Sequence, residues 1–291
     1  MTVLRRQWAD LPQPAREAIQ AQVGAVTAAR SAEVGLTSGV AASITTEGAA
    51  FFVKAAPAAA PVAPHLLRER AINQVLPAPI PAPRLLWTAD TGGWITLLFE
   101  HAPGSPADLS PSSPDLAAVA DAVAAVSIPC PLPNAPSVTA KAAGLLRAAE
   151  ELLAESPAGL AHYQPLVKRL DPGELTGPTL LQADLHADNL LVNGGQAQII
   201  DWSMACTGAA WIDAALLVPR LIDAGHTPEQ AEEFAARFPA WESAPPDAVT
   251  ALASVRFLFS ARMAEVGPPH LREKRLRAAS AGRAWVDYRL A

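Results

Sequence analysis

The chain has 291 residues, of which 51% are hydrophobic and 17% are charged, and this balance predicts a globular chain that can bury a sizeable core. Its formal net charge of -6 argues against nucleic-acid binding, which usually needs a basic surface. Its two cysteines lie far apart in the sequence, and no apolar run approaches the ~20 residues of a membrane span, so we expect a cytoplasmic protein with neither disulfides nor a membrane segment.

Residues 1–101 predict a small β-rich lobe. Two β-rich runs are separated by a turn at 46–48, and an Ala- and Pro-rich loop over 55–64 then leads to a helix that ends before four closely spaced prolines. The elements expected in chain order are a helix over 14–23, strands over 34–46 and 49–55, a helix over 65–76, and strands over 84–88 and 94–99.

The pattern changes after Pro103 and Gly104, where long helical segments begin. The elements expected there are helices over 115–126, 138–154 and 159–170, short strands over 179–182, 189–193 and 196–200, and further helices from 211 to the end. This order predicts an α+β fold with an N-terminal lobe at 1–101, a hinge near 98–104 and a large helical C-terminal lobe at 102–291.

The segment from Gln182 to Asp201 contains the residue types that phosphoryl transfer to a hydroxyl requires. Asp184 and Asn189, five residues apart, can place a carboxylate and an amide at opposite ends of one loop. Asp201 follows a β-hairpin, so its carboxylate can return to the same place. We therefore predict that Asp184 orients the hydroxyl and accepts its proton, and that Asn189 and Asp201 hold Mg²⁺.

At these residues the chain resembles the aminoglycoside phosphotransferase and choline kinase-like family. Members carry a His-x-Asp-x-x-x-x-Asn loop followed by an Ile-Asp-Trp metal motif, and the matching segments here are Gln182-Ala-Asp184-Leu-His-Ala-Asp-Asn189 and Ile200-Asp201-Trp202. Gln182 stands where the family usually has a histidine that supports the loop through hydrogen bonds, a role that glutamine can also fill. Asp213 matches the family's Asp that opens a helix and buttresses the loop.

The resemblance spans about residues 34 to 215 and implies a protein-kinase-like two-lobed fold. It also implies that Lys54, near the end of the second β-run, grips the α- and β-phosphates of ATP or GTP, with Glu69 on the following helix as its acidic partner. The other nucleotide contacts that it implies come from a covering loop with Ser38 and Gly39, and from the backbone of a hinge with Glu100 and Ala102.

The expected function is therefore transfer of the γ-phosphate to a hydroxyl of a small molecule, an antibiotic or a metabolite, by a monomer or homodimer. Aminoglycosides are polycations, and a site for them needs carboxylates. From Asp213 onward, however, the sequence has ten acidic and ten basic side chains, with one acidic cluster that could line a cleft for an amine. The cluster comprises Asp223, Glu229, Glu232 and Glu233.

Two other functions remain open from the sequence. Gln182 suggests a catalytically impaired pseudokinase that binds nucleotide and acts as a scaffold. The alternation of Asp184, His186 and Asp188 suggests a metal-dependent phosphoesterase, but the Gly-Asp and Gly-Asn-His segments that such an enzyme needs are absent from the sequence, which disfavours it. His186 and Asp188 are therefore expected to pack the loop.

Overall fold

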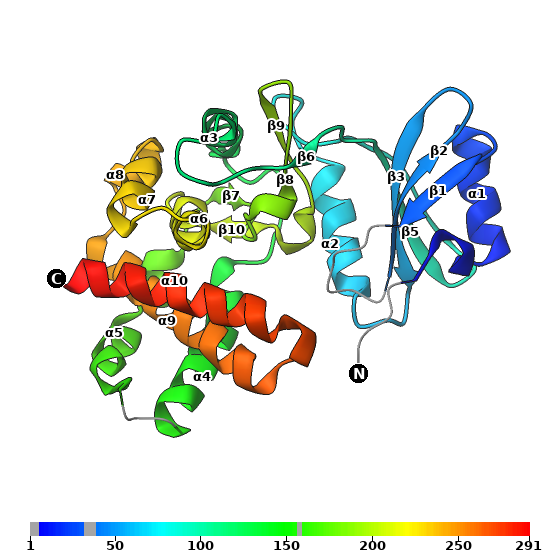
Figure 1. Ribbon diagram of the computed structural model, residues 1–291. Coiled ribbons are helices and arrows are strands. Elements are labelled where there is room, and N and C mark those ends of the chain that lie inside the picture. The colour runs from blue at the N-terminus through cyan, green and yellow to red at the C-terminus, as the bar shows by residue number, and fades with distance from the viewer. Residues whose placement is uncertain (1–5, 32–38, 156–158) are drawn as a thin grey trace. The chain divides into compact units, whose positions relative to one another are not determined.

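The computed structural model describes residues 6–31, 39–155 and 159–291 (Figure 1). The chain forms two compact units, which we call the N-terminal unit (1–105 and 198–205) and the helical unit (106–197 and 206–291). The sequence did not indicate that residues 198–205 group with the N-terminal unit. Among the helices of the described ranges, none is long and apolar enough to cross a bilayer.

The N-terminal unit contains a five-stranded antiparallel sheet with the order β1-β2-β3-β5-β4. Its strands are β1 (Ala28–Ser31), β2 (Val40–Thr45), β3 (Ala50–Pro57), β4 (Leu85–Thr91) and β5 (Trp94–Glu100), and its helices are the short η1 (Trp8–Asp10), α1 (Gln13–Val23) and α2 (Ala63–Asn73). Strand β1 was missed because its side chains are mostly exposed and show no alternation. The predicted strand over 34–46 begins at Val40, and residues 32–38 lie outside the described ranges.

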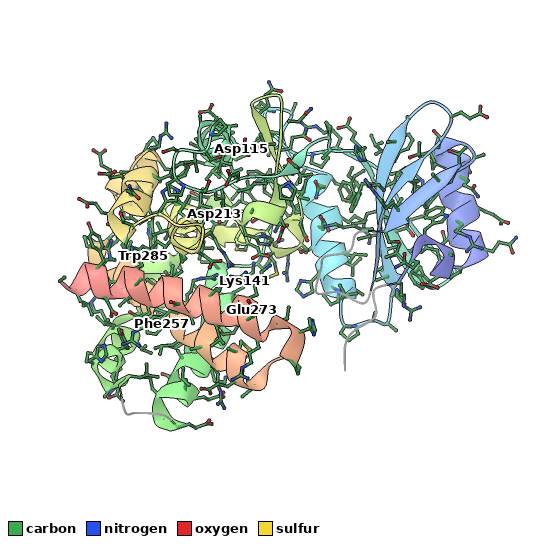
Figure 2. All side chains as sticks on the ribbon, viewed as in Figure 1. Asp115, Lys141, Asp213, Phe257, Glu273 and Trp285 are labelled. Atoms are coloured by element: carbon green, nitrogen blue, oxygen red, sulfur yellow. The ribbon has the colours of Figure 1, made fainter. Side chains whose placement is uncertain are left out.

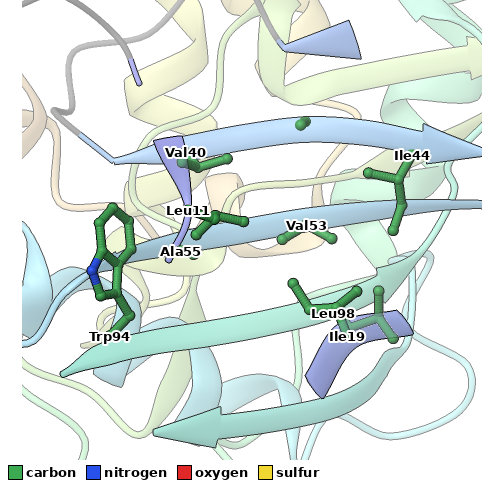
Figure 3. Close-up of a cluster of buried hydrophobic side chains, with 9 residues drawn as sticks. Leu11, Ile19, Val40, Ile44, Val53, Ala55, Trp94 and Leu98 are labelled. Atoms are coloured by element: carbon green, nitrogen blue, oxygen red, sulfur yellow. The ribbon is translucent and has the colours of Figure 1, made fainter. Parts of the chain in front are cut away.

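Side chains of the central strands alternate between two apolar clusters, as the period of a β-strand requires. Figure 3 shows the first cluster, in which Val53 of β3 and Leu98 of β5 pack with Ile19 of α1. The second cluster takes the opposite faces of the same strands, including Ala56 and Leu97, together with residues of α2. Because Lys54 shares the side of β3 that carries Ala56, its side chain belongs to the α2 face of the sheet.

The helical unit is built from eight α-helices within the described residues. They are α3 (Asp115–Ala125), α4 (Val138–Glu155), α5 (Gln164–Arg169), α6 (Ile212–Asp223), α7 (Pro228–Ala235), α8 (Pro239–Glu242), α9 (Pro246–Val266) and α10 (Arg272–Leu290). Strands β7 (Thr179–Leu181) and β10 (Cys206–Gly208) pair antiparallel, and β8 (Leu190–Asn193) and β9 (Gln196–Ile199) form the predicted hairpin. The predicted helix over 159–170 is instead a 3-10 turn followed by the short α5.

Helices α9 and α10 pack side by side and form the core of the helical unit (Figure 1). Gly282 of α10 allows this close approach, since a Cβ there would lie 2.7 Å from Phe257 Cβ of α9. The ring of Phe257 meets the edge of Tyr163 with centroids 4.7 Å apart, and Trp285 is buried in the same region (Figure 2). This packing fixes the spacing between α9 and α10.

Candidate active site

Three charged side chains of the N-terminal unit meet at one point. Lys54 Nζ lies 2.7 Å from Glu69 Oε1, 2.9 Å from Glu69 Oε2 and 3.1 Å from Asp201 Oδ1. Strand β3 supplies the lysine, α2 supplies the glutamate, and the turn after β9 supplies the aspartate. Glu69 also accepts a hydrogen bond from the backbone amide of Trp202 at 3.2 Å, so α2 and the turn after β9 are joined through one carboxylate.

Burial and charge act in opposite directions on this cluster. Burial alone would lower the pKa of Lys54, but the carboxylates of Glu69 and Asp201 outweigh it and raise that pKa. Burial raises the pKa of Glu69 to about 6, against the attraction of Lys54. For Asp201 the effect of burial is outweighed by Lys54 and by hydrogen bonds from Ser203, and its pKa falls to about 2. Asp201 is therefore held as a carboxylate, the form that can bind a cation.

The backbone at Asp201 is left-handed, with a φ of 57°. A non-glycine residue pays steric strain in this region, and such strain is often found at functional sites. The 3-10 turn Trp202–Met204 that follows offsets part of it, because Asp201 caps the turn by accepting the amide of Ser203 at 3.4 Å. Arg68 of α2 donates to the carbonyl of Ser203 at 3.2 Å and ties the turn to the helix.

The loop from Gln182 to Asn189 in the helical unit is held by a buried carboxylate. Asp213 lies at the start of α6 (Figure 2). It accepts the amide of Gln182 at 2.8 Å and the amide of Ala183 at 2.9 Å. Ala183 has a left-handed φ of 64°, so these two bonds stabilise a strained turn directly before Asp184. Burial raises the pKa of Asp213 to about 6, although both amide hydrogen bonds oppose the rise.

Side chains on both sides of Asp184 bind its backbone. The Oε1 atom of the fully buried Gln182 accepts the Asp184 amide at 2.7 Å, and Asn189 Nδ2 donates to the Asp184 carbonyl at 3.0 Å. The Asp184 side chain nevertheless remains 41% exposed. The loop therefore fixes the main chain of Asp184 and leaves its carboxylate accessible, with the Asn189 amide nitrogen engaged and directed at the loop.

His186 lies between two carboxylates of the same loop. Its Nε2 is 3.8 Å from Asp184 Oδ2 and its Nδ1 is 3.6 Å from Asp188 Oδ2, while Lys274 Nζ lies 3.7 Å from Asp188. Burial is the main reason that the pKa of His186 is lowered, with the charges of Arg220 and Lys274 acting in the same direction. Within the described ranges, no three His, Cys, Asp or Glu side chains gather as a metal cluster.

Comparison with known proteins places the chain in a family. The sequence pattern of the phosphotransferase enzyme family matches residues 35–246, which is more than half of the chain. The chain belongs to the phosphotransferase enzyme family. The resemblance predicted from the sequence is thus confirmed, and the chain is a small-molecule kinase. No protein with a curated function matches it in a sequence comparison.

Solved structures of other phosphotransferases share the fold at low identity. A thermostable mutant of aminoglycoside phosphotransferase APH(4)-Ia, in ternary complex with ADP and hygromycin B, has 16% identity and a TM-score of 0.57, covering 92% of this chain and 97% of its own. Spectinomycin phosphotransferase APH(9)-Ia, in complex with ADP and spectinomycin, has 12% identity and a TM-score of 0.60 over 96% and 98%. An aminoglycoside phosphotransferase from Alicyclobacillus acidocaldarius subsp. acidocaldarius DSM 446 has 14% identity and a TM-score of 0.57 over 91% and 92%. These likenesses confirm the predicted kinase-like α+β fold.

The remaining residues predicted to contact the nucleotide of this phosphotransferase are Ser38, Gly39, Glu100 and Ala102. Ser38 lies outside the described residues. Gly39 directly precedes β2 and lies close to β3, so that a Cβ there would be 2.7 Å from the Ala55 carbonyl oxygen. Glu100 ends β5, and its amide already donates to the Arg84 carbonyl at 2.9 Å. Its carbonyl rather than its amide would therefore have to meet the adenine. Ala102 is half-buried in the segment that follows.

Sequence reasoning missed a group of arginines around Asp184. Arg220, Arg256 and Arg275 come from α6, α9 and α10, and the charge of Asp184 acts on Arg256 and Arg275. They were counted in the sequence only as part of the charge balance of the tail. A usable signal was Arg256 itself, since it is the one charged residue in the mostly apolar stretch 248–258 and charged residues are rarely placed in such stretches without a function or a partner.

Proposed function

We propose that this phosphotransferase transfers the γ-phosphoryl group of ATP or GTP to a hydroxyl of a small acceptor, with Asp184 as the general base. The observation that carries the proposal is the loop geometry at Asp184, whose backbone amide and carbonyl are both hydrogen-bonded to loop side chains while its carboxylate stays 41% exposed. A base must be held in place and must also reach its substrate, and this loop supplies both conditions.

In the proposed reaction, the acceptor oxygen forms a bond to the γ-phosphorus while the bond between that phosphorus and the β–γ bridging oxygen breaks. The nucleoside diphosphate leaves with the bridging oxygen, and the hydroxyl proton passes to the carboxylate of Asp184. Most of the acceleration in such reactions comes from positioning and from charge stabilisation, so the hydrogen bonds that fix the loop are part of the catalytic machinery.

Lys54 is proposed to bind the α- and β-phosphates. Its ammonium is held by Glu69 at 2.7 Å, and the raised pKa of Lys54 keeps it charged. Two of the structural neighbours described above, APH(4)-Ia and APH(9)-Ia, were solved with ADP, which supports a nucleotide site in this fold. The loop with Ser38 and Gly39, and the backbone of Glu100 and Ala102, are proposed to complete that site.

Asn189 and Asp201 are proposed to hold Mg²⁺. An amide oxygen and a carboxylate are hard oxygen donors of the kind that Mg²⁺ prefers, and Mg²⁺ usually takes only one or two carboxylates plus substrate phosphates. The residues fit this use, because Asn189 Nδ2 is engaged with the Asp184 carbonyl, leaving Oδ1 for a cation, and Asp201 is kept ionised with a pKa of about 2. When bound, the ion would neutralise charge on the transferred phosphoryl group.

The position of Gln182 argues against the pseudokinase alternative. That alternative rested on glutamine replacing histidine, yet Gln182 is fully buried and accepts the Asp184 amide at 2.7 Å. The loop therefore keeps a side-chain acceptor at this position. For the acceptor, two of the neighbours were solved with hygromycin B and with spectinomycin, and we propose a hydroxylated small molecule here as well, an antibiotic or a metabolite.

The test compares Asp184→Asn with Asp188→Asn, an exposed neighbour in the same loop. Removal of the general base should lower phosphate transfer by roughly 10²–10⁴-fold and leave nucleotide affinity unchanged, whereas Asp188→Asn should keep most of the activity. Lys54→Met should instead weaken nucleotide binding in calorimetry by about tenfold or more. Full transfer by Asp184→Asn, or unchanged nucleotide affinity in Lys54→Met, would refute the assigned roles.

A further inference from the structure

The helical unit surrounds the catalytic carboxylate with positive charge. The charge of Arg220 of α6 acts on Arg256 of α9 and on Arg275 of α10, and Arg275 acts on Arg256 as well; the charge of Asp184 acts on both in the opposite direction. Burial, followed by the charge of Arg220, lowers the pKa of Arg256 to about 10, which still leaves it cationic at neutral pH. Lys274 lies on the His186 side of the same loop.

Two of these arginines have no protein partner for their guanidinium groups. Among the residues that the structure describes, the side chains of Arg220 and Arg256 make no hydrogen bond and no ion pair, although both are at least half-buried. Elsewhere in the helical unit the pattern is the opposite, since Arg262 pairs with Glu155 at 2.6 Å and Arg289 pairs with Glu232. A guanidinium withdrawn from water without a partner is costly, so its retention beside the loop needs a reason.

Two small cavities of the helical unit meet at Arg256. One is lined by Arg220 and Arg256 among apolar residues of α6, α9 and α10. The other is lined by Lys141 and Arg256 and reaches Ala183, the residue directly before Asp184. Neither cavity is lined by an acidic side chain. Each measures about 30 Å³, room for solvent or a small charged group but not for a whole acceptor.

The nearby acidic side chains are engaged with other groups. Asp213 accepts the two loop amides, and Asp188 lies 3.7 Å from Lys274. In the acidic cluster that the sequence suggested for an amine, Asp223 pairs with Arg277 at 3.5 Å and Glu232 bonds both Arg289 and the indole of Trp285. The charge that faces Asp184 is therefore mainly positive.

We propose that the acceptor carries an acidic group, a carboxylate or a phosphate, which the guanidinium groups of Arg220 and Arg256 bind while its hydroxyl lies at Asp184. Arginine presents planar N–H donors that match carboxylate and phosphate oxygens, and its pairing with an anion away from water is strong. A polycationic acceptor would meet repulsion at the same place. The inference rests on the proposed phosphotransferase function and names its substrate class.

The first test uses the unmodified protein and matched acceptors. Phosphate transfer from ATP is measured for hydroxy acids against neutral counterparts of the same skeleton, such as glycerate and glycerol 3-phosphate against glycerol and gluconate against sorbitol, with hygromycin B as a cationic acceptor. We expect the acids to be preferred, and the carboxylate and phosphate arms show which anion is used. Preference for the neutral or cationic compounds would overturn the inference and leave the phosphotransferase function standing.

The second test needs no turnover. Binding of malonate and of inorganic phosphate is measured by calorimetry while a non-hydrolysable ATP analogue saturates the nucleotide site. Loss of a charged hydrogen bond predicts that Arg256→Gln and Arg220→Gln weaken anion binding by roughly tenfold or more, with Arg256→Lys intermediate. The control is Arg277→Gln, an exposed arginine of α10 that pairs with Asp223 and should have no effect.

The outcomes separate the two hypotheses. If neither malonate nor phosphate binds to the wild-type protein, the acidic acceptor is refuted whatever the transfer assay shows. If Arg256→Gln weakens nucleotide binding instead of anion binding, the arginines serve the nucleotide and the inference is also refuted. If the protein binds no nucleotide and phosphorylates nothing, the proposed phosphotransferase function fails on its own. Because Arg256 is partly buried, thermal unfolding of each variant is recorded, and Arg220→Gln repeats the test at a second position.

Discussion

Asp213 supports the catalytic loop from within the helical unit, and its removal should destabilise the protein more than an ordinary surface substitution does. In Asp213→Ala the buried amides of Gln182 and Ala183, bonded at 2.8 and 2.9 Å, lose their acceptor. A buried donor left unsatisfied costs about 1–3 kcal/mol, so two of them predict a loss of about 2–6 kcal/mol in the free energy of unfolding. The activity should fall as well, because Ala183 would be free to leave its left-handed conformation.

The matched control is Asp223→Ala, the same substitution at the other end of α6. Asp223 lies 3.5 Å from Arg277 at a solvated position, and such a surface pair contributes about 0–1 kcal/mol. Urea unfolding followed by both tryptophan fluorescence and far-UV circular dichroism gives the two free energies and shows whether the probes agree. Equal unfolding midpoints for Asp213→Ala and Asp223→Ala would refute the assignment of Asp213 as the support of the loop.

Three further predictions concern Gln182, Gly282 and Asp213 of the helical unit. Gln182→Leu should lower kcat by about tenfold to a hundredfold, because the Asp184 amide loses its acceptor, whereas Gln182→His should restore most of it; equal kcat values in the two variants would contradict this. Gly282→Ala should destabilise by about 1–3 kcal/mol, since a Cβ there would lie 2.7 Å from a side-chain carbon of α9, while Gly144→Ala in α4, where a Cβ meets nothing within 4 Å, should stabilise by about 0.5–1 kcal/mol in thermal unfolding. The pKa of Asp213 is about 6 in the native protein against an ordinary 3.8, so as the pH falls the native state binds this proton before the unfolded state does. The contribution of Asp213 to the free energy of unfolding should therefore rise by about 1 kcal/mol from pH 7 to pH 5. A difference between wild type and Asp213→Asn that stays flat over this interval would contradict the raised pKa.

Much of the fold could be predicted because the spacing of apolar residues along the sequence indicates where helices and strands lie. The helices over 14–23, 115–126 and 138–154 were placed within a few residues, since each has an apolar face with helical spacing and clear ends. Strand β1 was missed because its exposed side chains show no period, and the helix over 159–170 is interrupted near Pro165, where a short 3-10 turn precedes α5.

The sequence alone indicated a small-molecule kinase, because the spacing of Asp184, Asn189 and Asp201 resembles the loop and metal motif of the phosphotransferase family. It also nominated Lys54 and Glu69, which the structure places 2.7 Å apart. The surroundings of these groups, in contrast, depend on how the chain folds. Gln182 serves Asp184 through a contact that depends on burial, and Arg220, Arg256 and Arg275 gather around the loop because three helices distant in the sequence pack together. A count of charges along the sequence does not show which side chains face one another. Helix packing sets these positions, and it places arginines near Asp184 although the C-terminal sequence carries equal numbers of acidic and basic residues.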